Sequence, residues 1–491
     1  MCKVVFTMVL LLMAASGLNS ATAPDTLWTR TYGGPSFEWP WYVVETSDDG
    51  YVIAGYTGST AHGDRDIYIV KLNQDGSFAW EKTYGMQDCE DEARSIEETE
   101  DGGLIVAGYG SGQFGDEGAN FYMMKLDASG NSLWDEDYDY DTTTDYGSGV
   151  CQTLDGGYII IGDSYYYSTS QGAYDWGANI VKTDASGVKQ NHLLIDRVGI
   201  QHLNRVVATA DSGAIAIGTA GTLYVVKINK YGDTTWIKSY GGVGAGWGIV
   251  QLADGGYMAF GDRKFSTPMD EDFWLIRLNS NGDSLWTRRY QNEAPDLGYG
   301  LDQTSDGGFV MCGEMYRNGG MDPTDIYVIR TDANGDTLWT KTVGGDNYER
   351  SYCIKQTSDG GYIIVGRTDS FGAGDYDFYI VKLAPDNPMS ADVIPETIPY
   401  SFNLGANFPN PFNPVTTIDY SIPSRTNVSL EIFDLLGRKV RTLVDEIKPA
   451  GVYQVDWDGC DNFDQPVATG VYLYRLKAGA LTQTRKMILL K

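Results

Sequence analysis

Short, mostly apolar segments recur in a fixed order along residues 24–383. Each repeat has an Asp-Gly-Gly-like turn and then a nearly continuous apolar run, such as Tyr51–Gly55 or Leu104–Gly108, a pattern typical of strands buried on both faces. A strand with Lys or Arg near its end follows, and then a turn and a strand that carries Trp. Four short strands in about 50 residues predict one blade of a β-propeller. The Lys/Arg strand recurs seven times, at 66–72, 120–126, 178–183, 223–228, 272–278, 325–331 and 377–383.

The two ends of the repeat region predict how the ring closes. The first Trp strand, around Trp28, precedes any Asp-Gly-Gly turn, whereas the last repeat ends at Leu383 with no Trp strand after it. The N-terminal strand is therefore expected to complete the last blade, which removes the exposed sheet edge. The sequence predicts an all-β protein with a seven-bladed β-propeller over residues 24–383, and the Trp residues are expected to pack between its blades.

The repeat also predicts that the two faces of the propeller differ. In a four-stranded antiparallel blade the first and third turns lie at one face, and here these are uniform Gly-closed turns such as Asp101–Gly103. The second loops and the blade-to-blade connections lie at the other face, and they are long and variable, as at 163–176 and 137–148. Variable loops on a rigid scaffold commonly carry function, so we expect a ligand to bind at that face.

Aromatic residues gather in these variable loops. Aromatic rings stack on the CH faces of sugars while neighbouring carboxylates bind the hydroxyls. Tyr and Trp equally dominate protein–protein interfaces, and loop packing is a third interpretation. The candidate ligand-binding residues are Trp39, Trp41, Tyr138, Tyr140, Tyr165, Tyr166, Tyr167, Tyr174 and Trp176.

Four aspartates in the same region are spaced like the first part of a calcium loop. Hard carboxylate oxygens suit Ca²⁺, which makes calcium the candidate cofactor. The spacing departs from an EF-hand at Thr142, where the turn Gly belongs, and at Ser148, where the closing Glu belongs. The candidate metal ligands are Asp137, Asp139, Asp141 and Asp145.

No catalytic constellation is visible in the sequence. The three histidines, His62, His192 and His202, have neither zinc-ligand spacing nor a nucleophile motif beside them. With 66 acidic residues, carboxylate pairs arise by chance, and no pair is singled out for glycoside hydrolysis. The sequence therefore favours a binding protein over an enzyme.

The net charge and the N-terminal sequence indicate which partners and which cellular location to expect. The formal net charge is −30, and residues 398–491, with 10 Lys and Arg against 9 Asp and Glu, contribute none of that excess. Such acidity repels phosphate backbones and excludes nucleic acid as an expected partner. Residues 1–23 are predicted to be a secretory signal peptide, since Lys3 precedes a short apolar run and small residues follow it. No other run approaches a transmembrane length, so we expect an exported protein with no membrane span in its mature chain.

A change of composition marks a second domain. Residues 384–401 are rich in Pro, Asp and small residues, which is typical of a linker. Short segments with polar/apolar alternation follow, at 416–422, 428–433, 452–457 and 471–476. They predict a small β-sandwich over residues 402–491.

The motifs of this second domain resemble the C-terminal sorting domain of type IX secretion substrates. They lie in the family's order along the chain, at Asn407–Pro414, Phe433–Val440, Trp457–Gly459, Gly470–Leu476 and Lys486–Lys491. The resemblance implies an immunoglobulin-like fold, the type IX secretion machinery as partner, and passage through the periplasm to the outer cell surface or the medium. An ordinary immunoglobulin-like domain is the alternative. The residues that the resemblance implies for the sorting signal are Gly437, Arg438, Gly470, Tyr472, Lys486 and Lys491.

Three functions remain open from the sequence. The first is non-catalytic binding of a polysaccharide or a surface protein through the loop face. The second is a secreted glycan-degrading enzyme, a lyase or hydrolase with acidic catalytic residues. The third is a structural component of a surface layer. Turnover of a glycan, binding without turnover, or retention in a surface assembly without a soluble ligand would separate them.

Overall fold

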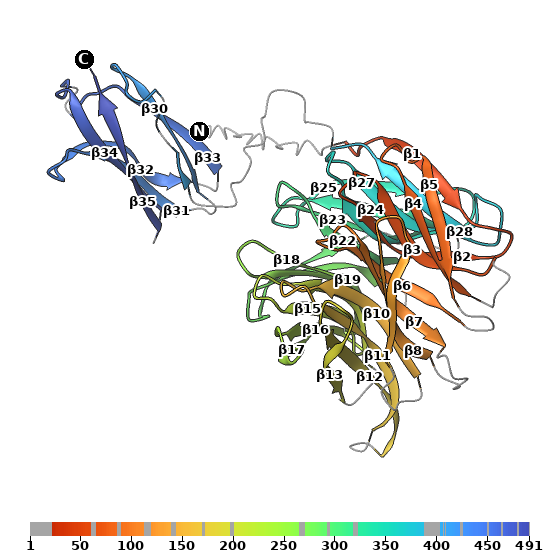
Figure 1. The fold of residues 1–491 in the computed structure, drawn as a ribbon. Helices are drawn as coiled ribbons and strands as arrows, with labels where there is room; N and C mark the ends of the chain where they lie inside the picture. Colours follow the sequence, from red (N-terminus) through yellow and green to blue (C-terminus); the bar gives the residue numbers. More distant parts are fainter. Residues whose placement is uncertain are drawn as a thin grey trace, which may run out of the picture. The chain divides into compact units, whose positions relative to one another are not determined.

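The structure is a computed structural model of the chain. It describes residues 22–59, 65–85, 90–111, 119–138, 144–168, 172–196, 201–264, 271–291, 295–317, 323–386, 403–405, 407, 409–422, 426–448, 451–462, 465–478 and 481–490. In this part of the chain the regular elements are β-strands, which form nine sheets (Figure 1). The chain divides into two compact units, each of which is considered by itself.

Seven antiparallel sheets of four strands form the propeller, one for each repeat of the sequence. The first three sheets are β2 (Glu38–Glu45), β3 (Tyr51–Thr57), β4 (Asp66–Leu72) and β5 (Phe78–Tyr84); β6 (Glu92–Glu98), β7 (Leu104–Ser111), β8 (Ala119–Leu126) and β9 (Ser132–Tyr138); and β10 (Thr144–Gln152), β11 (Tyr158–Ser168), β12 (Ala173–Thr183) and β13 (Lys189–Ile195).

The next three sheets are β14 (His202–Ala208), β15 (Ala214–Thr219), β16 (Leu223–Ile228) and β17 (Thr234–Tyr240); β18 (Gly244–Gln251), β19 (Tyr257–Lys264), β20 (Glu271–Leu278) and β21 (Ser284–Tyr290); and β22 (Asp296–Gln303), β23 (Phe309–Tyr316), β24 (Thr324–Thr331) and β25 (Thr337–Val343). The seventh sheet is β26 (Glu349–Gln356), β27 (Tyr362–Thr368), β28 (Asp377–Leu383) and β1 (Thr26–Tyr32).

The seventh sheet joins the two ends of the propeller region. β1 runs antiparallel to β28, in a register that pairs Thr26 with Leu383 and Tyr32 with Phe378. The N-terminal strand thus occupies the outermost place of the last blade, and the sheet has four strands like the other six. Closure of this kind joins the two ends of the propeller region within one blade and leaves only short outer edges.

The core lies between the sheets. Every residue of β3 and of β4 is buried, whereas the outermost strand β5 alternates between exposed and half-buried residues. This difference follows the sequence, because the second and third strands of each repeat are nearly continuous in apolar residues and the fourth alternates.

The repeated Lys of the third strand has a structural role at the uniform turns. Lys182 is 1% exposed, and its ammonium lies 3.0 Å from Asp155 Oδ1 and 2.9 Å from Thr153 Oγ1. Asp155 and Thr153 belong to the turn before the second strand, so the ion pair ties this turn to the third strand. The same pair recurs as Lys71–Asp48, Lys125–Asp101, Lys227–Asp211 and Lys382–Asp359.

The Tyr that ends several outermost strands links neighbouring blades. Tyr138, at the end of β9, is 6% exposed and donates a hydrogen bond of 2.6 Å to the carbonyl of Gly187 in the next blade. Tyr240 and Tyr290 make the same bond to Gly282 and Gly335. The structure therefore places Tyr138 in blade packing, since its hydroxyl is bonded and its ring is buried, and a role of Tyr138 in ligand binding stays a prediction.

The C-terminal unit is a sandwich of two sheets. One sheet holds β29 (Asn403–Leu404), β30 (Thr416–Ile422) and β33 (Gly451–Trp457), and the other holds β32 (Lys439–Lys448), β31 (Thr426–Phe433), β34 (Gly470–Ala478) and β35 (Leu481–Leu489). Alternate residues of these strands, among them Ile418, Leu430 and Tyr474, fill the space between the sheets. The predicted fold class, a seven-bladed propeller followed by an immunoglobulin-like sandwich, is confirmed. In the part of the chain that the structure describes, no helix is long and apolar enough to cross a membrane.

Candidate functional site

The innermost strands of the seven blades surround a central channel. Five of these strands carry a β-bulge at the same position, where one residue is skipped in the pairing with the second strand. A bulge re-aims the side chain of the extra residue. One residue at this position from each blade lines the channel: Trp41, Arg94, Ser148, Asn204, Trp247, Tyr299 and Tyr352.

A second ring of variable residues lies next to the ring of bulge residues. Each of them directly follows the Gly that recurs in the second strand of every blade. At Gly162 an added Cβ would collide with the carbonyl oxygen of Tyr146 on the innermost strand, so only Gly allows the two strands to approach this closely. The same collision with the backbone of the innermost strand holds in the other six blades. The residues that follow these glycines are Tyr56, Tyr109, Asp163, Thr219, Asp262, Glu314 and Arg367.

Residues of both rings enclose a cavity of about 480 Å³, at the end of the channel where the variable loops begin. Aromatic rings and polar groups share its wall, including Trp41, Tyr109, Tyr146, Asp163 and His202. A cavity with an apolar lining and a few convergent polar groups is the usual form of a small-ligand site.

An acid–histidine pair lies in the wall of this cavity. His202 Nδ1 is 2.9 Å from Asp163 Oδ2. Burial favours the neutral imidazole, but the hydrogen bond and negative charge of Asp163 outweigh it, so the pKa of His202 is raised. Burial also raises the pKa of Asp163, and the hydrogen bond from His202 offsets this only in part. The pair therefore holds a proton more readily than either residue would in water.

A continuous series of aromatic contacts leads away from the cavity. Tyr109 packs edge-on against Tyr146, with ring centroids 4.6 Å apart, and Tyr146 stacks on Trp176 at 5.6 Å. Trp176 also contacts the ring of His202 at 5.7 Å and that of Tyr165 at 5.2 Å. The aromatic residues of one blade thus extend the wall of the cavity outward.

The series continues on the long hairpin of β11 and β12, which projects beyond the other strands of the propeller (Figure 1). The pairing sets Tyr165 opposite Trp176 and Tyr167 opposite Tyr174. Because side chains alternate between the faces of a strand, these four rings share one face of the hairpin. Tyr167 and Tyr174 are each 54% exposed. We call this face, formed by Tyr165, Tyr167, Tyr174 and Trp176, the aromatic ribbon.

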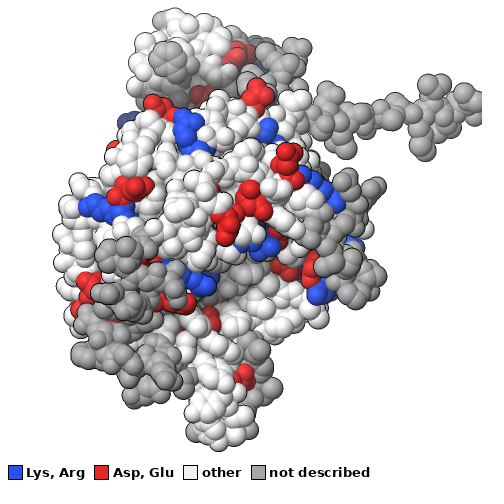
Figure 2. Space-filling model, turned by 90° about the vertical axis from the view of Figure 1, so that its right-hand side faces the viewer, with Lys and Arg blue, Asp and Glu red and all other residues white. Residues whose placement is uncertain are grey.

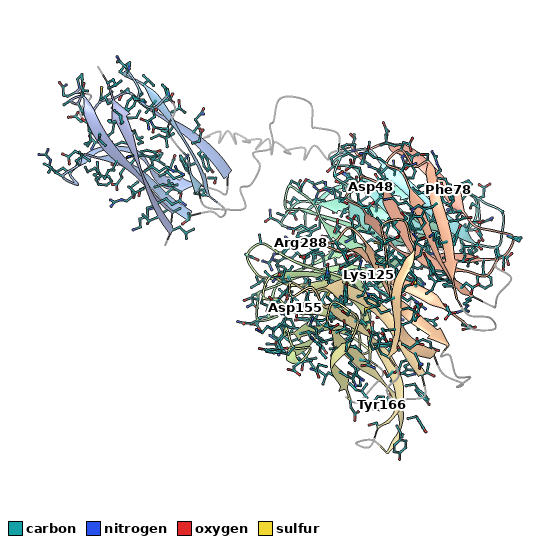
Figure 3. The ribbon with its side chains drawn as sticks, in the orientation of Figure 1. Asp48, Phe78, Lys125, Asp155, Tyr166 and Arg288 are labelled. Carbon is teal, nitrogen blue, oxygen red and sulfur yellow. The ribbon has the colours of Figure 1, made fainter. Side chains whose placement is uncertain are left out.

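The opposite face of the hairpin is held to the propeller. Tyr166, labelled in Figure 3, is 8% exposed and donates a hydrogen bond of 2.7 Å to Asp196 at the end of β13. Ser168 donates to the same carboxylate at 3.1 Å. Tyr166 therefore lies on the other side of the hairpin from the aromatic ribbon, and the Asp196 carboxylate holds the ribbon in place.

The other two predicted aromatic residues lie on β2, the innermost strand of the first blade. Trp39 and Trp41 stack at 5.9 Å, and Trp41 contacts Tyr352 at 4.9 Å. Arginine side chains cover both indoles: Arg367 lies 3.6 Å above Trp39, and Arg94 lies 4.0 Å above Trp41. Cation–π contacts of this kind hold the guanidinium groups in place at the channel wall.

The predicted calcium ligands are only partly covered by the structure. Tyr140, Asp139 and Asp141 lie outside the described residues. Asp137 lies on β9, and Asp145, on β10, is 1% exposed. Among the described residues no group of three or more His, Cys, Asp or Glu side chains is placed to hold a metal ion. Calcium binding stays a prediction.

The residues of the implied sorting signal lie at two places in the sandwich. Gly437, with φ of 75°, and Arg438 belong to the exposed turn between β31 and β32. Gly470 and Tyr472 lie on β34, and Lys486 is exposed on β35. Tyr472 is buried, and its hydroxyl donates to Ala468 O at 2.6 Å. Lys491 lies outside the described residues.

Acidic and basic side chains are mixed on one side of the molecule. On the side of the molecule shown in Figure 2, Lys and Arg side chains lie among Asp and Glu side chains rather than apart from them. The net charge of −30 is thus not gathered into one acidic patch on this side.

Sequence reasoning missed most of the residues that line the channel. It singled out Trp41 but passed over Arg94, Asp163 and His202. A signal was present, because the residue after each repeated Gly varies from blade to blade while the residues before it stay apolar. Variation inside an otherwise regular repeat marks the positions that packing does not fix.

Comparisons with known proteins support the fold of both units. Residues 46–78 match the model of a β-propeller domain of unknown function, and residues 415–481 match the model of the FlgD Ig-like domain. No curated protein matches the chain.

Several solved structures are similar over most of this chain. One is a protein of unknown function from Dyadobacter fermentans, with 12% identity over 74% of this chain and 99% of that one and a TM-score of 0.43. YCF48 from Cyanidioschyzon merolae has 11% identity over 73% and 99%, with a TM-score of 0.42. PorZ, a surface component of the type IX secretion system of Porphyromonas gingivalis, has 11% identity over 89% and 65%, with a TM-score of 0.36. Similarities this distant assign no function, and the likeness to propeller and Ig-like domains rests on the two family models.

Proposed function

We propose that the protein binds a polysaccharide through the cavity at the channel mouth and the aromatic ribbon beside it. The observation that carries the proposal is the unbroken series of rings from Tyr109 and Tyr146 in the cavity wall to Tyr167 and Tyr174 on the hairpin. A series of exposed rings offers stacking surfaces to successive sugars. A single small molecule in the cavity would not need the outer pair.

The cavity supplies the polar groups that such a ligand needs. Asp163, His202, Asn204 and Thr219 line it and can bond sugar hydroxyls as donors or acceptors. The ribbon is also held in advance of binding, since Tyr166 and Ser168 anchor its back to Asp196. A rigid platform loses less entropy when a ligand binds, and this favours affinity.

The test is a glycan array probed with the whole protein and with the double variant Tyr167→Ala/Tyr174→Ala. Because both rings are 54% exposed, their removal should leave the melting temperature unchanged. We expect a saturable glycan signal that weakens about tenfold or more in the double variant. Tyr231→Ala is the matched control, since Tyr231 is 63% exposed in a turn between β16 and β17. Unchanged binding by the double variant would remove the ribbon from the site.

The same array addresses calcium. Chelation should leave the glycan signal intact if the rings alone carry binding. Loss of the signal on chelation, and its return with Ca²⁺, would support a metal role for Asp137, Asp139, Asp141 and Asp145.

Turnover of the bound glycan is a second candidate, favoured by the Asp163–His202 pair in the cavity wall. An imidazole held by a carboxylate through Nδ1 is a common arrangement for a general base. The measurement is release of new ends from any glycan that the array identifies, with His202→Gln as the variant. Binding that persists without turnover would leave the protein a binding protein.

We also propose that the C-terminal sandwich directs export by the type IX machinery to the cell surface or the medium. Support comes from the ordered motifs between 407 and 491 and from the exposed turn that presents Gly437 and Arg438. The test expresses the full chain, and a chain without residues 402–491, in a bacterium that has this machinery. We expect the truncated chain to accumulate in the periplasm, and equal export of both chains would contradict the proposal.

A further inference from the structure

Arg205 is an unpaired cation in the wall of the central channel. It lies on β14, one residue beyond the bulge residue Asn204, and it is half-buried. Its guanidinium lies 4.3 Å above the ring of Tyr42. It makes no hydrogen bond and no ion pair with any residue that the structure describes. Buried or half-buried charges are normally paired, so a cation without an anion is a sign of an absent partner.

Neither Asp302 on β22 nor Glu97 on β6, two acids of the innermost strands, forms an ion pair with Arg205. Asp302 is 3.2 Å from the ammonium of Lys355 and also accepts a hydrogen bond of 2.9 Å from the backbone of Gln356. Lys355 lies over the same Tyr42 ring as Arg205, at 5.5 Å, so the second cation adds to the positive charge there. Burial raises the pKa of Glu97 to about 7, which removes part of its negative charge at neutral pH. The channel therefore holds more positive than negative charge around Tyr42.

A second donor without a partner belongs to Trp41, which lines the same cavity as Arg205. The indole N–H of Trp41 is buried and has no hydrogen-bond partner among the described residues. Trp41, Arg94 and Arg205 line a small cavity of about 50 Å³, which shares Trp41 and Arg94 with the larger cavity at the channel mouth. The small cavity has room for one compact polar group, and its wall offers donors to it.

We propose that this small cavity is a subsite for an anionic substituent of the glycan, a carboxylate or a sulfate group, bound by Arg205 and the Trp41 indole N–H. The inference rests on the proposed glycan function and names its ligand class: an acidic polysaccharide. A guanidinium matches the planar oxygens of such groups, and an ionised acceptor strengthens each hydrogen bond.

The acidic net charge of the chain does not prevent an acidic polysaccharide from binding in the channel. Salt screens exposed charges beyond about 8 Å at physiological ionic strength, so distant acids act weakly on a group inside the channel. The Lys and Arg side chains that lie among the acids in Figure 2 lower the repulsion further. Affinity for the acidic ligand should fall as salt rises, because a charge pair carries part of it.

The experiment measures quenching of tryptophan fluorescence in the whole protein by three probes: a short oligogalacturonate, its methyl ester, and inorganic sulfate. Trp41 and Trp247 line the small cavity and report on its occupation. We expect the acid to bind about tenfold more tightly than the ester, and sulfate to compete with the acid but not with the ester.

Arg205→Gln should abolish this preference and leave binding of the ester unchanged. Arg288→Gln is the control, because Arg288 is an arginine of the outer strand β21 (Figure 3). Trp41→Phe keeps an aromatic side chain but removes the N–H together with the five-membered ring of the indole, so it should reduce the preference while Trp247 still reports on the cavity. If Arg205→Gln does not fold, this variant carries the test.

The outcomes separate the two proposals. Equal affinity for acid and ester, or an Arg205→Gln variant that still prefers the acid, overturns the anionic subsite and leaves glycan binding intact. Sulfate binding that is lost in Arg205→Gln, with neither oligosaccharide bound, supports the subsite and counts against the proposed function for this glycan.

Discussion

The two ends of each blade are built from the same repeat but have diverged to different degrees. At the turn end, Thr, Asp, Gly and a buried Lys recur with the same contacts in blade after blade, as in Lys125–Asp101 and Lys182–Asp155. At the channel mouth the equivalent positions hold Trp, Arg, Ser, Asn and Tyr in turn. The turn end is constrained because each of its residues completes a hydrogen bond within its own blade. The channel mouth is free to vary because its side chains point into open space, and this freedom is what a ring of repeats can use for recognition.

The largest expected effect comes from the one constrained position at the channel mouth. Gly162→Ala places a Cβ against the carbonyl of Tyr146, and the strands have no room to separate. We expect a loss of about 3 kcal/mol in the free energy of unfolding, measured by urea denaturation. Gly242→Ala is the control, since the nearest atom to its added Cβ is a side-chain nitrogen of Arg263 at 3.6 Å. Similar stability of the two variants would show that close approach does not explain the repeated Gly.

The next effect tests the turn end. Lys182→Ala removes a fully buried ammonium and empties the space of its side chain beside Thr153 and Asp155. We expect a loss of about 2 kcal/mol, smaller than for a fully enclosed ion pair because Asp155 remains 48% exposed. Lys230→Ala, at an exposed lysine of the β16–β17 turn, should change the unfolding midpoint little. An equal loss in both variants would contradict a special role for the repeated Lys.

A pair of substitutions in one blade compares the two ends directly. Thr209→Val at the turn end removes a hydroxyl that donates to Asp211 and accepts from Lys227, so it should cost about 1 kcal/mol. Thr219→Val at the channel mouth has the same change of shape and should stay within about 0.5 kcal/mol, while it alters affinity for the ligand. A costlier change at Thr219 would show that the channel mouth also supports the fold.

The smallest effect is on the acid side of the stability profile. Hydrogen bonds from Thr99, the Gly103 backbone and Lys125 lower the pKa of Asp101 to about 2. A lowered carboxyl pKa contributes stability above the unfolded value near 4, and this is lost as pH falls toward 2. In Asp101→Asn this contribution is absent, so the unfolding midpoint should fall less between about pH 4 and pH 2 than it does in the unchanged protein. Asp346→Asn, in an exposed loop, is the control, and an unchanged slope in Asp101→Asn would contradict the assignment.

Local patterns predicted the fold well because six of the seven blades are built from four strands that follow one another in the sequence. Apolar runs, Gly-closed turns and the missing last Trp strand all act over a few residues or between sequence neighbours, and the sheet order follows from them. Tyr138 shows which contacts local patterns leave out. Its position beside an aspartate-rich loop suggested ligand binding, but its hydroxyl reaches the turn of the next blade, 49 residues along the chain.

The sequence by itself determined that this protein is a ring of seven four-stranded blades with a separate sandwich, because strand periodicity and turn chemistry are short-range properties. Only the tertiary structure decided which residues share the central channel. Arg205 on β14 and Tyr42 on β2 are far apart in the chain, and so are Asp163 and His202 in neighbouring blades. These contacts form because ring closure brings the innermost strands of different blades together and the bulges direct single side chains into the central channel. A pattern within one repeat contains no information about that arrangement.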